Sequence, residues 1–484
     1  MTDAVKFKHP SYIDNYPLWE KLDDICRGQE AVKEKREKYL PRNNPQDQSA
    51  EAKGYYDSYL QRAVFYGVTK TTLGSLIGAA FATDPAFKFP DELDHLNRNA
   101  NGAGLSIYQV SQGALRLVLK HYRCALYVDF PSVAPSKNVA EDRTKNAYPM
   151  IHLLSAKSVI NWGSITINNQ RKLNLVVIYE VTSERSPDGF TLVNQEQYRV
   201  LRLEDAGGGD YIYTVEVFAD NGKDSIVSLG KSIPTDYNGD YWDYIPFTFI
   251  GAIDNSDEID TAPLLDLANL NIAHYRDSAD FQESVYYMGQ PQYFAHGVDW
   301  TWFDEAKKRG IYIGAKTLLP FPPGGGIDIA QASPNTLSRE AMKDKWDQMK
   351  ELGARLVEPG SATQKTATQS DNDDAVQHSV LSLCVVNVSE AMTNSLRWCA
   401  KYAMPDVNKL SDDELVYEVS KEFSKQGYLA DLSKQLYEAA IQGRSSFKTW
   451  WEYNQTGMFP KLTYVDEQKN IEAERDGTLN QGVR

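Results

Sequence analysis

The feature that most constrains this chain is a pattern of helix, polar loop and helix between Pro334 and Ala403. Apolar residues at spacings of three and four predict a helix over 337–357 with one apolar face. That face carries Met342, Trp346, Met349, Leu352 and Leu356. The other positions carry charges of both signs, as on a helix that faces solvent or a second subunit. They include Arg339, Glu340, Lys343, Asp344, Asp347, Lys350 and Glu351.

A polar segment separates this helix from a second one. Pro359-Gly360 ends the first helix, and residues 361–373 include no aromatic or large aliphatic side chain. Asp373 or Asp374 can cap a second helix that runs to about Ala403. Its apolar face carries Val376, Val380, Cys384, Val388, Met392, Leu396 and Cys399. A loop of this length with nothing to bury is either functional or disordered, and the sequence alone leaves both interpretations open.

Length and composition indicate a globular protein with several domains. A chain of 484 residues is long enough for about two to four domains. Its apolar content of 42% and charged content of 24% are ordinary. No run of about eighteen apolar residues is present, and the first ten residues have no apolar core, so we expect neither a membrane span nor a secretory signal. The four cysteines form no CxxC pair, so we expect small buried side chains in a reducing compartment.

The formal charge of −15 argues against a protein whose main task is to grip nucleic acid. Affinity for DNA comes largely from Lys and Arg on phosphates, and acidic residues are in excess here. The charge is compatible with a protein that lets DNA pass without holding it. The 29 tyrosines fit large protein–protein contacts and, equally, a sugar-binding surface.

The N-terminal half is predicted to begin with helices and to continue with strands. The apolar spacing predicts a short helix with Leu18, Trp19, Leu22 and Ile25 on its inward side. It also predicts helical segments at 50–82 and 105–121, and a strand at 125–130 follows the second of these. From there to about residue 250 the period changes to two, which predicts an antiparallel meander with turn sequences between its strands. The predicted strands are 149–154, 158–162, 172–182, 190–204, 211–219 and 246–250.

The rest of the chain alternates helical and irregular segments. Pro263 opens a helix that runs to about Met288. Residues 289–336 are irregular and rich in Pro, Gly and aromatic side chains. Residues 411–459 look helical, and we expect the polar tail after Asp466 to fray.

Motifs of enzymes and cofactor sites are missing from the sequence. No phosphate-binding G-x-x-x-x-G-K-[ST] and no G-x-S-x-G is present, and the triple glycines at 207–209 and 324–326 read as turns. The seven histidines never approach metal-ligand spacing with each other or with cysteine. The acidic cluster 254–260 is rich in oxygen ligands but lacks the glycine of a calcium loop, and it precedes a helix whose dipole favours negative charge. We therefore expect no catalytic residue, cofactor or metal.

The order of several short signatures resembles the portal proteins of tailed bacteriophages, in a branch catalogued as a domain of unknown function. The similarity extends over most of residues 12–460. Its signatures are Tyr39-Leu40-Pro41, the stretches 59–66 and 76–85, Tyr127 to Pro131, Pro263 to Ala268, Asn271 to Tyr275, and Gly289-Gln290-Pro291. Each is weak alone, and together they are fairly specific.

The resemblance implies an α+β fold divided as in a portal subunit. A wing of N-terminal helices and β meander would cover 1–262, and 263–288 and 337–357 would be the two stem helices. A small clip would cover 289–336 between them. A tunnel loop at 358–373, a long wing helix at 374–403 and a helical crown with a flexible tail at 404–484 would follow.

The resemblance also implies a function without enzymatic activity. Subunits would form a ring, usually a dodecamer, at one capsid vertex of the virion, after assembly in the host cytoplasm. Double-stranded DNA would be packaged through its channel by the terminase large subunit and ejected through it later. Head–tail adaptor or tail proteins and the major capsid and scaffolding proteins would be further partners, with no membrane.

The resemblance assigns candidate residues to three surfaces. The loop would contact DNA through Ser361, Thr363, Gln364, Lys365, Thr366, Thr368 and Gln369. The stem would face the channel with Asp277, Asp280 and Glu283, whose charge would repel phosphate. The clip would meet terminase or adaptor through Trp300, Trp302 and Phe303.

Two other interpretations stay open. The acidic, Tyr- and Trp-rich composition also suits a carbohydrate-active enzyme of the virion, which predicts a cleft with two carboxylates. The chain could instead be another ring-forming head–tail connector, although 484 residues are many for an adaptor.

Overall fold

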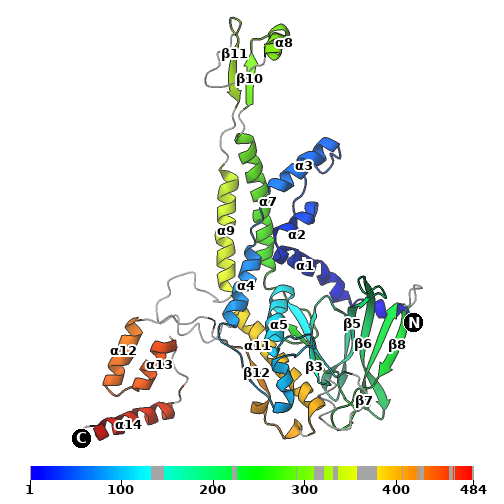
Figure 1. The fold of residues 1–484 in the computed structure, drawn as a ribbon, viewed down its shortest axis with the longest axis vertical. Helices are drawn as coiled ribbons and strands as arrows, with labels where there is room; N and C mark the ends of the chain where they lie inside the picture. The colour runs from blue at the N-terminus through cyan, green and yellow to red at the C-terminus, as the bar shows by residue number, and fades with distance from the viewer. Residues whose placement is uncertain are drawn as a thin grey trace.

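The computed structural model has a broad lower part from which a narrow helical projection rises (Figure 1). It describes residues 2–131, 147–220, 226–289, 292–309, 321–330, 336–356, 379–405, 407–421, 423, 430–456, 462 and 464–481. Helices and antiparallel sheets occupy separate stretches of the chain, so the predicted α+β class is confirmed. No helix in these described ranges combines the length and apolarity that a membrane crossing requires.

Five α-helices precede the first long strand, and local capping explains where three of them begin. They are α1 (Pro10–Arg27), α2 (Gln29–Glu34), α3 (Ala50–Arg62), α4 (Val68–Ala80) and α5 (Ile107–His121). Pro10 fits the first turn of α1, and the Ser49 side chain caps α3. Ser106 and Gln109 form a reciprocal capping box at the start of α5. Short 3₁₀ helices lie at Thr2–Lys6, Arg36–Lys38, Asp91–Asn97, Val407–Lys409 and Asp412–Glu414.

The strands between 123 and 251 form two sheets, so the prediction of one meander was wrong. The smaller sheet has β2 (Arg123–Asp129) between β3 (Met150–Ser155) and β9 (Phe247–Gly251). The larger sheet is a five-stranded meander of β4 (Val159–Ile167), β5 (Gln170–Arg185), β6 (Leu192–Gly207), β7 (Asp210–Asp220) and β8 (Ile226–Ser232). The sequence missed β8 because this edge strand is exposed at all but its first residue and carries no apolar alternation.

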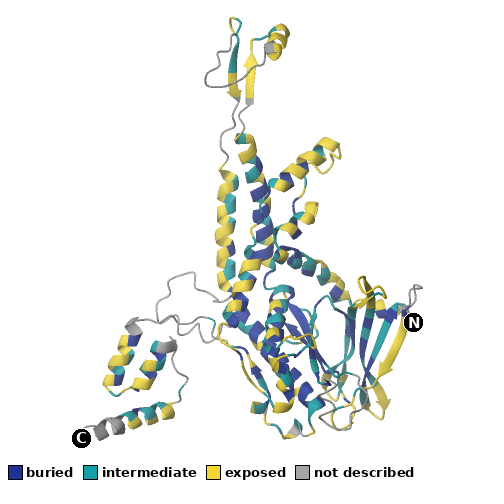
Figure 2. Cartoon of the chain, viewed as in Figure 1, coloured by how far each residue is buried: buried dark blue, intermediate teal, exposed yellow. Residues whose placement is uncertain are grey.

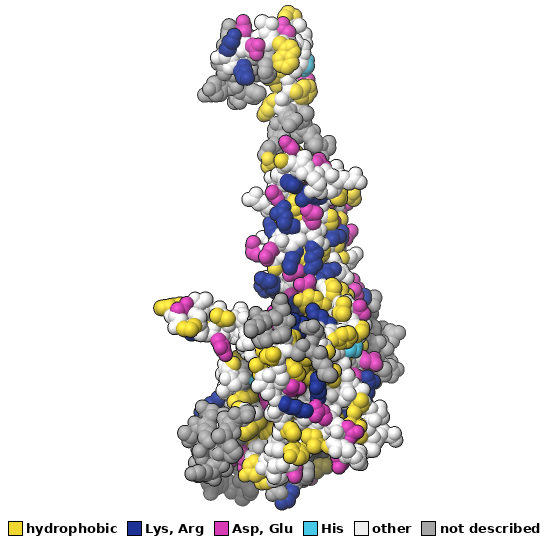
Figure 3. All heavy atoms as spheres, turned by 90° about the vertical axis from the view of Figure 1, so that its right-hand side faces the viewer, with side chains coloured by type: hydrophobic (Ala, Val, Ile, Leu, Met, Phe, Trp, Pro, Cys, Tyr) yellow, Lys and Arg dark blue, Asp and Glu magenta, His cyan; other side chains and the backbone are white. Residues whose placement is uncertain are grey.

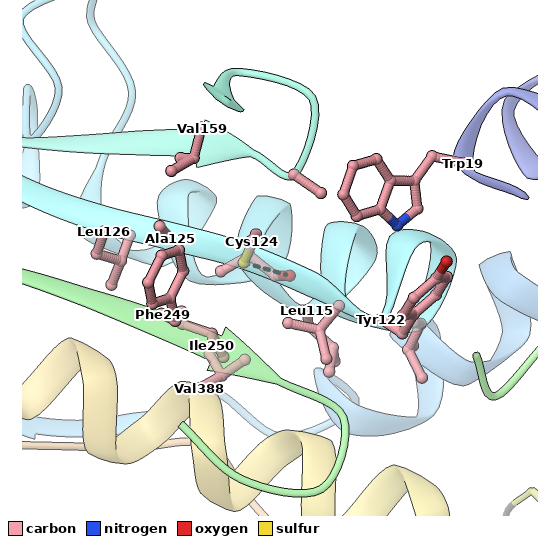
Figure 4. Packing of buried hydrophobic residues seen from close by; sticks show 14 of the residues in the cluster. Trp19, Leu115, Tyr122, Cys124, Ala125, Leu126, Val159, Phe249, Ile250 and Val388 are labelled. Carbon is pink, nitrogen blue, oxygen red and sulfur yellow. Dashed lines mark hydrogen bonds between the residues drawn. The ribbon is translucent and has the colours of Figure 1, made fainter. Parts of the chain in front are cut away.

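The smaller sheet is the centre of the core because both of its faces are covered. On one face the hydroxyls of Tyr127 and Tyr213 lie 3.0 Å apart, which joins β2 to β7 of the larger sheet. On the other face the Cys124 thiol lies 3.7 Å from the Ala114 carbonyl of α5. Figure 4 shows Val388 of the long helix α11 (Val380–Ala403) next to Ile250 of β9. Burial on both faces explains why β2 is almost continuously apolar.

The helical pattern predicted over 50–82 is interrupted between α3 and α4. The backbone there is held by the next long helix, α7 (Leu265–Met288), instead of by helical hydrogen bonds. The Val64 amide donates to Ser278 Oγ at 3.2 Å, and Asn271 Nδ2 donates to the Tyr66 carbonyl at 2.8 Å. The break therefore fixes α3 against α7.

After α7 the chain makes a long excursion and returns. It forms β10 (Gln292–His296), α8 (Trp300–Arg309) and β11 (Gly326–Ala330), and then runs back along α9 (Leu337–Arg355) into α11. We call α7 with α9 the stem, and β10, α8 and β11 the distal hairpin. The base is the two sheets with α1, α4, α5 and α11. Figure 2 shows buried residues concentrated in the base, whereas α9 and the distal hairpin are largely exposed.

The C-terminal part differs from the prediction at two points. Within the segment expected to be helical, β12 (Val416–Glu418) pairs with β1 (Ala86–Lys88), and strands of three residues carry no readable period. The helices α12 (Ala430–Ile441), α13 (Phe447–Thr456) and α14 (Tyr464–Gln481) follow. The tail expected to fray is α14, whose Glu467 accepts hydrogen bonds from the Ser446 amide and the Thr449 hydroxyl at the start of α13. Glu474 accepts from the next two amides, so α14 caps α13 with two carboxylates.

Candidate functional site

The stem is an antiparallel pair of helices whose contact has two different edges. On one edge the Trp346 ring of α9 lies 6.2 Å from the Tyr66 ring and 6.3 Å from the His274 ring of α7. On the other edge the Lys345 ammonium pairs with the Asp277 carboxylate. Met349 is buried between the edges. The apolar stripe predicted for 337–357 thus packs α9 on α7, although Trp346 keeps 38% of its surface exposed.

Each of the three carboxylates predicted for a channel wall has a partner within the chain. Lys345 binds Asp277, and the Tyr59 hydroxyl donates to Asp280 at 2.5 Å. Arg62 of α3 donates from Nε to Glu283 at 3.0 Å and forms a second bond from its Nη2. Glu283 is 8% exposed, whereas Asp280 is exposed. In one subunit, therefore, only Asp280 presents its charge to solvent, and the assignment of all three to a channel stays a prediction.

The partners of these carboxylates come from α3, which sequence reasoning did not connect to the stem. Burial and the hydrogen bond to Asp280 raise the pKa of Tyr59 well above its ordinary value, so it stays a donor. The Arg62 guanidinium also stands 4.3 Å from the centre of the Tyr286 ring. Glu283 on the stem, three residues before Tyr286, was the available signal, but its basic partner lies 221 residues away in sequence.

His274 lies in the stem contact with no partner at its Nδ1 atom among the described residues. Burial is the largest influence and lowers the pKa of His274 below its ordinary value, with an opposing contribution from Asp277 and a reinforcing one from Lys345. The neutral imidazole is therefore favoured between Tyr66 and Trp346. This histidine stabilises the packed stem in its uncharged form.

The residues predicted for DNA contact lie outside the described part of the chain, which leaves out 357–378. They are Ser361, Thr363, Gln364, Lys365, Thr366, Thr368 and Gln369. The predicted caps Asp373 and Asp374 also lie outside it. The two described ends of this segment meet, because the Leu381 amide at the start of α11 donates to the Leu356 carbonyl after α9 at 3.2 Å. The segment therefore leaves and returns at one point, where stem and base join.

The distal hairpin exposes apolar side chains that a two-stranded ribbon cannot cover. In its antiparallel register Tyr293 of β10 is opposite Ile329 of β11. Neighbouring positions point to opposite faces, and both Tyr293 and Phe294 are about half exposed, at 50% and 49%. Two strands are only marginally stable on their own. Exposed aromatic residues on both faces are typical of a surface that contacts a protein partner.

The three clip residues predicted for partner contact behave differently. Trp300 is 82% exposed. Trp302 stacks on Phe321 at 5.1 Å between ring centres and so helps to fold the distal hairpin. The side chain of Phe303 lies outside the described atoms. Figure 1 places this hairpin at the end of the stem that is farthest from the base.

The described residues offer little support for catalysis or metal binding. A cleft of about 670 Å³ near the C-terminal end of α11 is lined by residues that include Asp236, Asp240 and Lys401. Asp236 accepts the backbone amides of Asn238 and Asp240, so it stabilises a turn. No three His, Cys, Asp or Glu side chains of the described ranges stand together as a metal site.

The acidic cluster 254–260 has a structural explanation in the base. Asp257 accepts hydrogen bonds from Ser164 at 2.6 Å and Arg171 at 2.8 Å, and Asp260 accepts the Ile253 amide at 2.7 Å. Burial alone would raise the pKa of Asp257, but these donors hold it below its ordinary value. The cluster ties the loop before α7 to the larger sheet.

Comparison with known proteins gives one family match and several similar structures. Residues 263–403, which include the stem, the distal hairpin and α11, match a family described as "Domain of unknown function (DUF4055)". The predicted resemblance to a family catalogued in that way is confirmed over this stretch. The sequence matches none of the curated proteins.

Two of the similar solved structures come from gene transfer agent (GTA) particles. A chain from the virion of a native GTA particle has a TM-score of 0.39 and 15% identity, covering 84% of this chain and 94% of that chain. A chain from the neck of an empty GTA particle, computed with C6 symmetry, has a TM-score of 0.38 and 16% identity, covering 84% and 93%.

Proposed function

We propose that this chain is the portal subunit of a particle of the tailed-bacteriophage type. A ring of copies would form the channel through which double-stranded DNA enters the capsid, driven by a separate terminase motor, and later leaves it. The ring would also bind the tail or its adaptor. The subunit itself would perform no chemistry.

The observation that carries this proposal is the path of the chain from 265 to 403. It leaves the base along α7, forms the distal hairpin, returns along α9 and enters the base again as α11. The resemblance divides a portal subunit into the same sequence of stem, clip, stem, loop and long helix. A rigid stem with a partner-binding tip at one end and a tethered loop at the other suits a conduit between two assemblies.

The distal hairpin is the surface that we assign to terminase and adaptor. Its exposed Tyr293, Phe294 and Trp300 provide apolar area that the subunit leaves uncovered. Aromatic residues in such positions often supply much of the binding energy of an interface. Two successive partners can use one such surface at different stages of assembly.

The loop within 357–378 is the segment that we assign to DNA. Its ends are held together by the bond between Leu356 and Leu381, so each subunit would present one short loop at a fixed height. Lys365 is its one basic residue, and a single cation binds phosphate weakly enough for DNA to slide. The exposed Asp280 and the formal charge of −15 would further limit adhesion.

Electron microscopy of the purified full-length chain tests the proposal. We expect rings with a central channel, viewed down the symmetry axis, and a mass that is a multiple of the 54.6 kDa chain. A chain that stays monomeric at high protein concentration, or that hydrolyses polysaccharide from the 236–244 cleft, would contradict it.

The loop assignment has a separate test. Lys365→Ala should leave ring formation unchanged and reduce the binding of a short DNA duplex to the ring at low salt. If rings of this variant fail to form, the segment serves assembly and the assignment to DNA is wrong.

A further inference from the structure

The charges of α9 are sorted into two stripes. The basic stripe has Arg339, Lys343 and Lys350, which are four and seven residues apart and so share one side of the helix. The acidic stripe has Glu340, Asp344, Asp347 and Glu351, at spacings of four, three and four. All seven side chains are exposed. Like charges four residues apart weaken an isolated helix, whereas Lys350 with Asp347 and Arg355 with Glu351 form ion pairs along it.

The basic stripe lies on one side of the stem. Trp346 marks this side, because its ring contacts Tyr66 and His274 there. Arg339, Lys343 and Lys350 are seven and three residues before Trp346 and four after it, so they continue from its edge. The Lys350 ammonium lies 5.7 Å from the centre of the Trp346 ring. We call the three cations the basic flank.

An acidic surface lies on the opposite side of the stem. The pair of Lys345 with Asp277 marks this side. Asp266 and Asp280 are eleven residues before and three after Asp277 on α7, so they share its face, and both are exposed. On α9, Asp344 and Glu351 are seven residues apart and lie on the side of Lys345 that faces away from Trp346. We call Asp266, Asp280, Asp344 and Glu351 the acidic flank.

Four of these charged side chains form no ion pair among the residues that the structure describes. Among described residues, Lys350 pairs with Asp347 and Arg355 with Glu351, both along α9. No ion pair within the same described ranges involves Arg339, Lys343, Asp266 or Asp344. Figure 3 shows Lys and Arg beside Asp and Glu along the narrow part of the molecule on the side of α3, whereas α9 lies on the far side of this view. The stem thus carries charge that a second molecule could neutralise.

We propose that neighbouring copies pack stem against stem, with the basic flank of one copy on the acidic flank of the next. This inference rests on the ring proposed above and names the surfaces that join it. Two different faces on opposite sides of one subunit give a head-to-tail contact, which closes into a ring when the rotation allows. In a closed ring every flank is covered, whereas an open head-to-tail pair would leave one flank of each type exposed.

The contact would determine register and direction more than strength. Exposed ion pairs contribute little each and are screened by salt, but several repeated around a ring favour one alignment of the helices. The proposal places Asp280 in a contact between copies, and its predicted position on a channel wall becomes the alternative that the experiment tests.

Charge reversal in the full-length protein tests the inference. One variant reverses the basic flank by Lys343→Glu and Lys350→Glu, and a second reverses the acidic flank by Asp266→Lys and Asp344→Lys. A third combines all four changes, which restores opposite charges at each contact. The matched control reverses two exposed lysines of other segments by Lys6→Glu and Lys88→Glu.

Native mass spectrometry and electron microscopy would measure the fraction of subunits in rings. We expect each single-flank variant to lose at least tenfold in ring fraction at low salt, and the combined variant to recover at least half of the wild-type fraction. The control should match the wild type. Circular dichroism and the thermal unfolding midpoint would verify that all variants fold.

The outcomes separate this inference from the proposed function. Wild-type rings together with unchanged rings in both single-flank variants would overturn the inference and leave the portal proposal intact. Folded variants that lose the ring without recovery in the combined variant would also overturn it. A wild-type chain that forms no ring would overturn both. An Asp280→Lys variant that keeps its rings would remove this residue from the acidic flank.

Discussion

The base and the distal hairpin of this protein are both built on antiparallel strands, yet they solve the burial of apolar side chains in different ways. In the base, β2 is covered on one face by the larger sheet and on the other by α5 and α11. In the distal hairpin, β10 and β11 pair with each other and with no other described strand, and they expose Tyr293, Phe294 and Ile329. The base therefore buries its central strand within one chain, whereas the hairpin leaves these side chains exposed.

The stem shows an intermediate case, which explains how the two regions are joined. In the contact between α7 and α9, Met349 is buried, Trp346 packs on His274 at one edge, and Lys345 pairs with Asp277 at the other edge. The outer surface of the stem carries sorted charge instead of apolar residues. Burial within one chain therefore decreases from the base through the stem to the hairpin.

The largest effect is expected from a change in the base. Trp19 is fully buried and packs against Tyr12 at 5.5 Å and Tyr122 at 6.1 Å between ring centres. Trp19→Ala should lower the free energy of unfolding by about 3–5 kcal/mol, since a large cavity remains. Chemical denaturation followed by circular dichroism measures it.

A conservative change at the same position provides the control. The Trp19 indole nitrogen has no hydrogen-bond partner in the described part of the chain, so Trp19→Phe loses only volume and should cost clearly less than the alanine variant. Equal losses in both variants would show that the ring is not packed as described and would remove the contrast with the hairpin.

The next effect concerns the link between α3 and the stem. Arg62→Ala leaves Glu283 without its cation at 8% exposure. Loss of one partner of a buried pair costs about 3–5 kcal/mol, and the partial exposure of Arg62 reduces our expectation to about 2–3 kcal/mol. The double variant Arg62→Ala with Glu283→Gln should recover part of this loss. If Arg62→Ala is as stable as the wild type, α3 does not depend on this pair.

The folded base of the molecule should lose stability as the pH is lowered, at pH values above those at which carboxylates ordinarily titrate. Burial is the main cause that lowers the pKa values of His95, His121 and His152. An unfolded histidine takes up a proton below about pH 6.5, whereas these folded ones resist it, so stability is full above that pH and falls as pH decreases below it. The free energy of unfolding should be lower at pH 5 than at pH 7.5.

Asp23 extends this loss to lower pH. Burial would raise its pKa, but hydrogen bonds from His121, Lys120 and Lys157 outweigh burial and hold the pKa well below the ordinary value. Its contribution is present above the unfolded pKa of about 4 and is lost as pH falls further. His121→Gln should flatten the dependence between pH 7.5 and 5. An equal free energy of unfolding at pH 7.5 and pH 5 would contradict this explanation.

The sequence predicted those elements whose burial follows a simple period. The spacings of three and four in α5, α7 and α9 report which side of a helix is covered, whereas β5 and β7 each have three consecutive buried residues. The spacings do not report what covers that side. The pairing of β1 with β12 joins residues more than 300 positions apart through three residue pairs. The separation of β2, β3 and β9 into their own sheet depends on which face of the sheet meets α5.

The candidate site was predictable to a similar degree. Helical spacing predicted a helix that includes Asp277, Asp280 and Glu283, the resemblance assigned that helix to a stem, and all three residues lie on α7. Their partners Lys345, Tyr59 and Arg62 were not predicted, because long-range ion pairs follow from the packing of α3 and α9. The exposure of Trp300 and the stacking of Trp302 likewise depend on the folded hairpin, since both are aromatic residues two positions apart.

The smallest effect on folding, and the sharpest test of the comparison, lies in these two tryptophans. Trp302→Ala removes the stacking on Phe321, which is worth about 0.5–1.5 kcal/mol, and should make the distal hairpin easier to cleave by protease. Trp300→Ala should change stability by less than about 0.5 kcal/mol, because its ring is 82% exposed. Limited proteolysis within 292–330 distinguishes the two variants. Faster cleavage of Trp300→Ala would mean that this ring is needed to fold the hairpin. An unchanged cleavage pattern would leave its apolar surface for a partner, as the contrast with the base requires.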